Sequence, residues 1–308
     1  MTPPSYLETN EAIFYEKIFN EFGKTQKEVE QYVDILRKWS EKQSHWPEMP
    51  TLNGLLYCIL VSKFSIENAK KRTDMYYTIK GLMPEIFTVH PSSPEVIKHS
   101  EIAYCVPIPK PTKSHERIFY VQLNPDYNPE DFKIELFFIQ ITHMVEVIIQ
   151  EDKCYNFHII FNASGIKIGH LARTHPMVLK KMSICFEKVY GYRVASIFVV
   201  NTYPYLDTFV NKLAMHLAVE KIRNRMKVSR NSDVLFEAFD KSLLPTDIGG
   251  EGLSLKELRL LLLKEFERMT PRFDRLQTMR TDESLRPAEL QNDDTLGYYG
   301  NFKKLDLD

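Results

Sequence analysis

The sequence predicts an α/β protein in which an N-terminal helical domain is followed by a mixed β-sheet with flanking helices. Residues 1–90 repeat apolar side chains at helical spacing. Residues 157–161 and 194–200 are short apolar runs rich in β-branched and aromatic side chains, which is typical of central strands covered on both faces. Helical and strand patterns alternate after residue 90, as they do when helices cross over between strands of one sheet.

The N-terminal helices follow from apolar stripes and from the residues that cap them. Residues 28–39 place apolar side chains on one face at helical spacing. Thr51 and Ser65 are suited to cap the next two helices, because a hydroxyl oxygen accepts a hydrogen bond from a free backbone N–H group. We expect the first of these helices to end near Val61 and the second to stop at Gly81.

Strands and longer helices are predicted beyond the helical domain. Residues 104–108 and 117–123 alternate in the way that strands do. Residues 131–151 form an expected helix that is apolar almost all round its middle, so it should be buried on more than one side. Residues 254–269 carry a leucine-rich pattern at helical spacing and predict a final helix.

These patterns divide the chain into three parts. We expect a helical domain over residues 1–90 and a sheet domain over residues 91–270. Residues 271–308 are polar and mixed in charge, which predicts a partly ordered C-terminal tail.

Composition and charge exclude several classes of protein. Of the 308 residues, 44% are hydrophobic and 26% are charged, and the formal net charge is −1, which does not suit a nucleic-acid-binding chain. The four cysteines form no CxxC pair, so neither a zinc site nor a disulfide scaffold is indicated. The longest apolar run, residues 55–61, is far below the roughly 18 residues of a membrane span, and no signal peptide is evident. We expect a cytoplasmic monomer without metal or cofactor.

Catalytic motifs are absent from the sequence. Ser164 lacks the Gly-x-Ser-x-Gly setting of a hydrolase nucleophile, and the nine histidines include no HExxH pair. The glycines at 165 and 169 lack the spacing of a phosphate-binding loop. Because no nucleophile and base can be paired from the sequence, we expect a protein that is not an enzyme.

The order of segments between residues 156 and 250 is more specific than any one motif. An apolar strand leads to Ala-Ser-Gly165, and a helix begins at Pro176. A second strand runs to Asn201, an apolar helix and a basic run follow, and the series ends at Leu244-Pro-Thr-Asp-Ile-Gly-Gly250. This order resembles the lipid-binding domain of the CRAL-TRIO family, which includes the retinaldehyde-binding and α-tocopherol-transfer proteins. Segments 63–69 and 84–87 resemble the small helical domain of the same family.

The resemblance implies an apolar cavity that is closed by a mobile gate helix after Asn201. The apolar stripe of residues 206–217 is by pattern alone more often an ordinary core face, and the resemblance favours the gate. His143, in the apolar helix, is by default a hydrogen-bonded core histidine. The resemblance implies instead that it faces the cavity and meets a hydroxyl or carbonyl group of the ligand. The implied lining residues are Phe119, Val121, Ile139, His143, Phe157, Phe161, Met182, Cys185, Phe186, Val194, Ile197, Val210, Leu213 and Leu217.

A basic run after the expected gate helix has two interpretations. An edge strand that faces solvent carries similar lysines and arginines. The resemblance instead places Arg193, Lys221 and Arg225 at positions that bind phosphoinositide headgroups, and arginine pairs with phosphate through two hydrogen bonds. Residues 55–60 depart from the family, since they lack the arginine of its Phe-Leu-Arg segment.

The resemblance implies a carrier that binds a small hydrophobic lipid and transfers it inside the cell. A retinoid, a carotenoid, a tocopherol or a similar molecule would suit the cavity, and phosphoinositides would attach the protein reversibly to the surface of anionic membranes. The alternative is a membrane-recruited adaptor or scaffold whose own side chains fill the cavity and which transports no ligand. A ligand that copurifies with the protein would separate the two.

Overall fold

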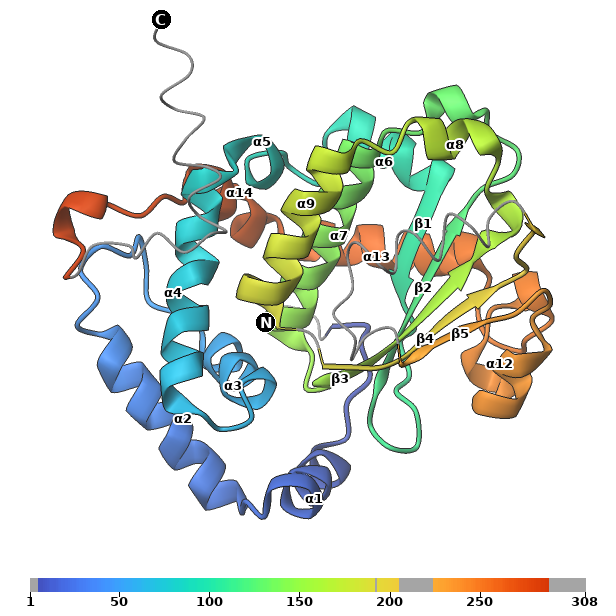
Figure 1. Ribbon diagram of the computed structural model, residues 1–308. Helices are drawn as coiled ribbons and strands as arrows, with labels where there is room; N and C mark the ends of the chain where they lie inside the picture. The colour runs from blue at the N-terminus through green and yellow to red at the C-terminus, as the bar shows by residue number, and fades with distance from the viewer. Residues whose placement is uncertain (1–4, 192, 205–223, 288–308) are drawn as a thin grey trace, which may run out of the picture.

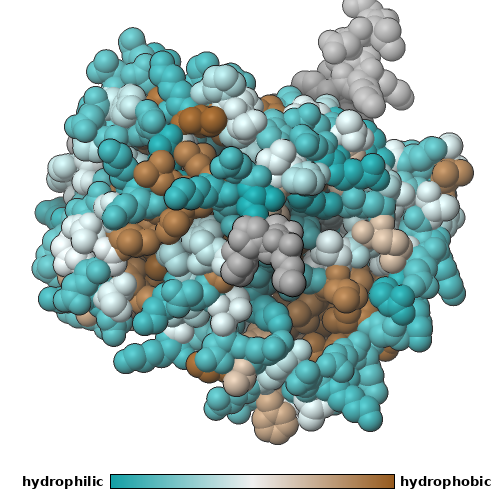
Figure 2. Space-filling view, turned by 180° about the vertical axis from the view of Figure 1, so that it is seen from behind, coloured by the Kyte–Doolittle hydropathy of each residue, from teal (hydrophilic) through white to brown (hydrophobic). Residues whose placement is uncertain are grey.

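The computed structural model describes residues 5–191, 193–204 and 224–287 of the chain. In these residues a group of helices near the N-terminus stands beside a sheet whose faces are covered by further helices (Figure 1). The fold class predicted from the sequence is confirmed. Figure 2 shows a face of the molecule on which hydrophilic side chains predominate and apolar ones gather in a few patches.

Capping side chains fix the ends of the N-terminal helices. The hydroxyl of Thr51 accepts a hydrogen bond from Gly54 and that of Ser65 accepts one from Asn68, as predicted. The expected stop at Gly81 is wrong, because the helix passes through it and ends next to Pro84, which cannot continue the hydrogen-bonding pattern. The helices are α1 (Glu11–Phe22), α2 (Gln26–Ser40), α3 (Leu52–Val61), α4 (Ile66–Leu82), α5 (Pro84–Phe87) and α6 (Pro94–Ile102).

One mixed sheet organises the second part of the described chain. Its strands follow the order of the sequence, with the first pair antiparallel and all later pairs parallel. The predicted strands are present, with ends shifted by one residue at most. The strands are β1 (Ala103–Pro107), β2 (Arg117–Leu123), β3 (Asn156–Asn162), β4 (Arg193–Val200) and β5 (Met226–Val228).

Helices lie against both faces of this sheet and along its edge (Figure 1). The central helix, α7, is buried on nearly all sides, as its apolar sequence predicts. A π-helical segment, η3 (Cys185–Tyr190), extends helix α9 toward the sheet. The helices of this part are α7 (Ile134–Glu151), α8 (Ile168–Ala172), α9 (Pro176–Ile184), α12 (Asp233–Ala238), α13 (Leu255–Arg268) and α14 (Thr270–Thr278).

A buried ion pair joins the sheet to the end of α7. The guanidinium of Arg117, at the start of β2, donates two hydrogen bonds of 2.8 Å to the carboxylate of Asp152, which follows α7. Both side chains are fully buried. Arg117 also donates to the backbone oxygens of Glu8 and Ile108, so one side chain ties the N-terminal segment, two strands and a helix together. A buried ion pair offsets the cost of removing its charges from water only when its donors and acceptors form hydrogen bonds, as they do here.

The first residues of the expected C-terminal tail fold onto the protein. Helix α14 buries Phe273 and Leu276, and Met279 follows at the same three-residue spacing. Arg272 donates to the carboxylate of Glu146 at 2.7 Å, and the hydroxyl of Tyr76 contacts both. The apolar spacing and this buried partner explain why a polar sequence is ordered there. Residues 288–308 lie outside the described part, and the domain boundary at residue 90 stays a prediction.

Replacing Arg272 with methionine should lower the free energy of unfolding by about 3–5 kcal/mol. The change removes the cation that hydrogen-bonds to the buried carboxylate of Glu146, and breaking a buried ion pair from one side costs this much. Urea unfolding at pH 7 measures the loss. Arg275→Met is the matched control, because that arginine is half exposed and its pair with Glu48 is worth less than about 1 kcal/mol. Equal losses in the two variants would contradict the assigned role of Arg272.

Candidate functional site

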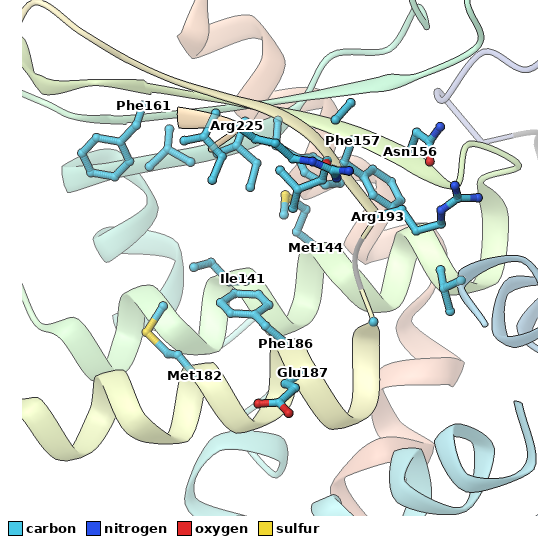
Figure 3. Close-up of a pocket in the computed structure, with 18 of the residues that line it drawn as sticks. Ile141, Met144, Asn156, Phe157, Phe161, Met182, Phe186, Glu187, Arg193 and Arg225 are labelled. Carbon is cyan, nitrogen blue, oxygen red and sulfur yellow. The ribbon is translucent and has the colours of Figure 1, made fainter. Parts of the chain in front are cut away.

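A cavity of about 920 Å³ lies between one face of the sheet and the helices α7 and α9. The close-up shows the sheet side chains on one side and those of the two helices on the other, with space between them (Figure 3). Its volume falls in the range of about 300–1,000 Å³ that holds small organic ligands. The cavity is therefore the candidate binding site.

The sheet contributes a wall of alternate side chains. Phe119 and Val121 of β2 line the cavity, as do Phe157, Ile159 and Phe161 of β3. Successive side chains of a strand point to opposite faces, so the odd-numbered residues of both strands share the cavity face. The rings of Phe119 and Phe157 stack at a centroid distance of 5.1 Å, which gives this wall a continuous aromatic surface.

The two helices contribute the opposite wall. Their lining side chains recur every three or four positions, which places them on one face of each helix. In Figure 3, Ile141 and Phe186 lie on the helix side of the cavity, opposite the sheet. The lining residues of these helices include Phe137, Ile141 and Met144 of α7, Leu179 and Met182 of α9, and Phe186 of η3.

Polar side chains lie toward one end of this apolar lining. Arg193 forms an ion pair with Glu21 of α1, and its guanidinium lies 5.0 Å from the ring centroid of Phe22. Arg225 donates a hydrogen bond to the carbonyl oxygen of Val194. Figure 3 shows both arginines near Asn156, away from the end that holds Phe161 and Met182. The sheet wall of the cavity thus has an apolar end and a basic end, and Ser183 and Glu187 add polar groups to the helix wall.

Several predicted site residues lie together on this cavity. The sequence alone missed the lining residues of α7, because a helix that is apolar all round does not show which side faces a cavity. The gate segment 206–217, with Val210, Leu213 and Leu217, lies outside the described residues, as does Lys221. The predicted residues that line the cavity are Phe119, Val121, Phe157, Phe161, Met182, Phe186, Arg193, Val194, Ile197 and Arg225.

Three predicted lining residues lie elsewhere, which corrects the expectation for them. Ile139 follows the lining residue Phe137 by two positions, and His143 follows the lining residue Ile141 by two. Two positions are about 200° round the helix, so both side chains face away from the cavity. Nε2 of His143 donates to the backbone oxygen of Val89 at 2.8 Å. Cys185 is buried with its sulfur 3.9 Å from that of Met83. His143 is a hydrogen-bonded core histidine and does not line the cavity.

Two N-terminal helices hold the end of η3 in place. Nη1 of Arg72 donates to the backbone oxygens of Glu187 and Val189, and the hydroxyl of Tyr57 donates to that of Tyr190 at 2.8 Å. A cation at the C-terminal end of a helix is favourable, because the last carbonyl groups lack partners. Gly191 then turns the chain at φ 58°. Helices α3 and α4 therefore fix one wall of the cavity.

A cluster on the opposite face of the sheet corrects the expectation that no nucleophile and base would pair. Ser196 lies 2.7 Å from Nδ1 of His158, whose Nε2 donates to Glu116 at 2.7 Å. Burial opposes ionisation, but the hydrogen bond from His158 and the charge of Lys17 lower the pKa of Glu116 to about 2. The ring of His158 packs against Phe239, and the cavity lies on the other side of the sheet. A ligand in the cavity does not reach Ser196.

Two family models match parts of the chain. Residues 103–250 match the CRAL/TRIO domain family, whose domains are generally non-catalytic lipid-binding domains, and residues 25–96 match the Pinta-like UBA domain. Residues 103–250 are therefore a CRAL/TRIO domain, as the sequence predicts. A solved structure described as the crystal structure of Sfh5 is similar over 97% of this chain and 100% of its own, with 9% identity and a TM-score of 0.41. No curated protein matches the sequence.

No helix in the described part of the chain combines the length and the apolar character that crossing a bilayer requires.

The position of His143 predicts a loss of stability in mild acid. Burial lowers the pKa of His143 to about 4, whereas an unfolded histidine titrates near 6.5. Between these values the unfolded state binds a proton that the folded state does not, so the free energy of unfolding falls as the pH drops, by about 3 kcal/mol in all. Urea unfolding at several pH values measures this loss. Between pH 6.5 and pH 4 the free energy of unfolding should fall less with pH in His143→Gln than in the wild type. An equal fall in both proteins would contradict this.

Proposed function

We propose that the protein binds a small hydrophobic lipid in the cavity and transfers it between membranes. The observation that carries the proposal is the apolar cavity of about 920 Å³ between the sheet and helices α7 and α9. A retinoid, a carotenoid or a tocopherol has the size and the apolar surface that such a cavity suits. Burying about 500 Å² of apolar ligand surface would contribute roughly 12 kcal/mol before the cost of association.

The alternative function, an adaptor whose cavity is filled by its own side chains, is less well supported. Aromatic side chains of β2 and β3 line open space, whereas a filled cavity would bring helix side chains into contact with them. An adaptor would also gain nothing from an uncovered apolar surface, which destabilises the folded state. The unfilled volume favours the carrier.

Membrane attachment is the second part of the proposal. Arg193, Lys221 and Arg225 match family positions that bind phosphoinositide headgroups, and basic residues near an anionic membrane contribute about 1 kcal/mol each. The gate segment 206–217 would open there, because its apolar face can enter the interface of the bilayer. Tyr203, which precedes the segment, is 43% exposed and is suited to that boundary. Reversible, peripheral attachment of a cytoplasmic monomer follows from this proposal.

Organic extraction of the purified protein should release about one hydrophobic molecule per chain, which mass spectrometry identifies. Ala195→Trp places a large ring in the cavity and should abolish the copurifying molecule, since Ala195 is part of the lining. Ala172→Trp, at an exposed position on α8, is the matched control and should retain it. A wild-type extract without any such molecule, together with failure of apolar ligands to bind the purified protein, would overturn the proposal.

A further inference from the structure

A chain of hydrogen bonds on the face of the sheet opposite the cavity joins an acid, a base and a hydroxyl group. The carboxylate of Glu116, before β2, accepts a hydrogen bond of 2.7 Å from Nε2 of His158 in β3. Nδ1 of the same ring lies 2.7 Å from the hydroxyl oxygen of Ser196 in β4. A neutral imidazole has one N–H donor and one acceptor nitrogen, and an ionised carboxylate can only accept. Because Glu116 takes the Nε2 hydrogen bond, Nδ1 is left to accept the hydroxyl proton of Ser196.

A β-bulge in β4 brings the serine into this position. Phe157 of β3 pairs with Val194 of β4, but the next residue, His158, pairs with Ser196. Ala195 is therefore the extra residue, and it lies on the cavity wall. In an unbroken register His158 would lie beside Ala195, which has no hydroxyl group. Bulges are frequent next to active sites, where they turn a side chain in a new direction.

Further polar contacts fix the acid and leave the three groups in contact with solvent. Nζ of Lys17 and Nδ2 of Asn156 both donate to Oε1 of Glu116, at 3.0 and 3.2 Å, so Oε2 is left for His158. The side chains of Glu116 and His158 are 17% and 15% exposed, and Ser196 is half-buried. A small molecule therefore reaches this cluster without entering the cavity.

Two aromatic rings form an apolar surface beside Ser196. The ring of Phe239 packs edge-on against that of His158, with the centroids 5.0 Å apart. Phe198 follows Ser196 by two positions in β4, so both side chains point to the same face of the sheet. The rings of Phe198 and Phe239 have centroids 5.3 Å apart. This surface suits the apolar part of a small, uncharged molecule.

We propose that the protein also hydrolyses small, uncharged carboxylic esters, with Ser196 as the nucleophile and His158 as the general base. Oγ of Ser196 bonds to the carbonyl carbon and gives its proton to Nδ1 of His158, and that proton leaves with the alcohol when the ester bond breaks. Water then gives a proton to His158 as it attacks the acyl group, and His158 returns this proton to Oγ when the acid leaves. Glu116 is a positioning residue, because it holds the ring with Nδ1 toward the hydroxyl group. This activity is independent of the lipid cavity.

Hydrolysis of 4-nitrophenyl acetate by the purified full-length protein tests the proposal, because the 4-nitrophenolate that is released absorbs visible light. In Ser196→Ala and in His158→Gln, kcat/KM should fall about 100-fold, since general-base catalysis contributes at least this factor. Ser183→Ala is the matched control, because Ser183 lines the cavity on the other side of the sheet. This control should keep the wild-type rate.

Glu116→Gln should lower kcat about tenfold or more and leave KM for the ester unchanged, because Glu116 acts through His158 and does not touch the ester. Glu116→Asp keeps the negative charge and should recover part of the loss. Circular dichroism checks that each variant is folded. An equal loss in both variants would remove the positioning role from the carboxylate.

A fluorophosphonate locates the nucleophile without any variant, because an activated serine displaces its fluoride and forms a stable ester with the phosphorus. Mass spectrometry of the labelled wild type should place the adduct on Ser196. A wild type that hydrolyses the ester no faster than Ser196→Ala would overturn the proposal, as would a label that is absent from Ser196. If Ser196→Ala does not fold, the position of the label decides the question.

Discussion

The rest of this structure depends on one constraint. Helices α7 and α9 lie over an apolar face of the sheet but leave the space between them and the sheet unfilled. Uncovered apolar surface costs about 25 cal/mol for each Å² that meets water. A chain that retains such a cavity must hold its walls apart by other contacts. Three polar anchors lie around the cavity: Arg117 with Asp152, Arg272 with Glu146, and Arg72 at the end of η3. Each fixes a wall element, β2, α7 or η3, to another part of the chain.

These anchors also give the N-terminal helices and α14 a role at the cavity. They contribute few lining residues, but they hold the elements that form its walls. Tyr57 and Arg72 fix η3, which supplies Phe186 to one wall. Arg272 reaches Glu146, two residues beyond the lining residue Met144 of α7. Removing one partner of a buried ion pair lowers the free energy of unfolding strongly, because the other charge stays buried without a partner. Placing them outside the lining leaves most of the cavity lining apolar.

The strands and the cavity face of the sheet could be predicted from the sequence, because alternation along a strand assigns each side chain to a face. Phe157 and Phe161 share the cavity face for this reason, and His158 does not. Helix α7 was ambiguous, since it is apolar on all sides, and the face assigned to His143 was wrong. Ser196 of β4 pairs with His158 of β3, which pairs with Glu116 before β2. Arg272 and its partner Glu146 are 126 residues apart in the sequence. Contacts of this range depend on the folded topology and leave no local pattern.

The central claim is that a lipid occupies the space between the sheet and helices α7 and α9. A photoactivatable fatty acid with its reactive group near the end of the chain tests this most directly, because it attaches covalently to whatever it touches. After irradiation and digestion, mass spectrometry should place the label on peptides that contain the cavity residues Phe161, Met182 or Ile141. An excess of unlabelled lipid should remove it. Labels confined to exposed peptides, or labels that excess lipid does not displace, would contradict the account.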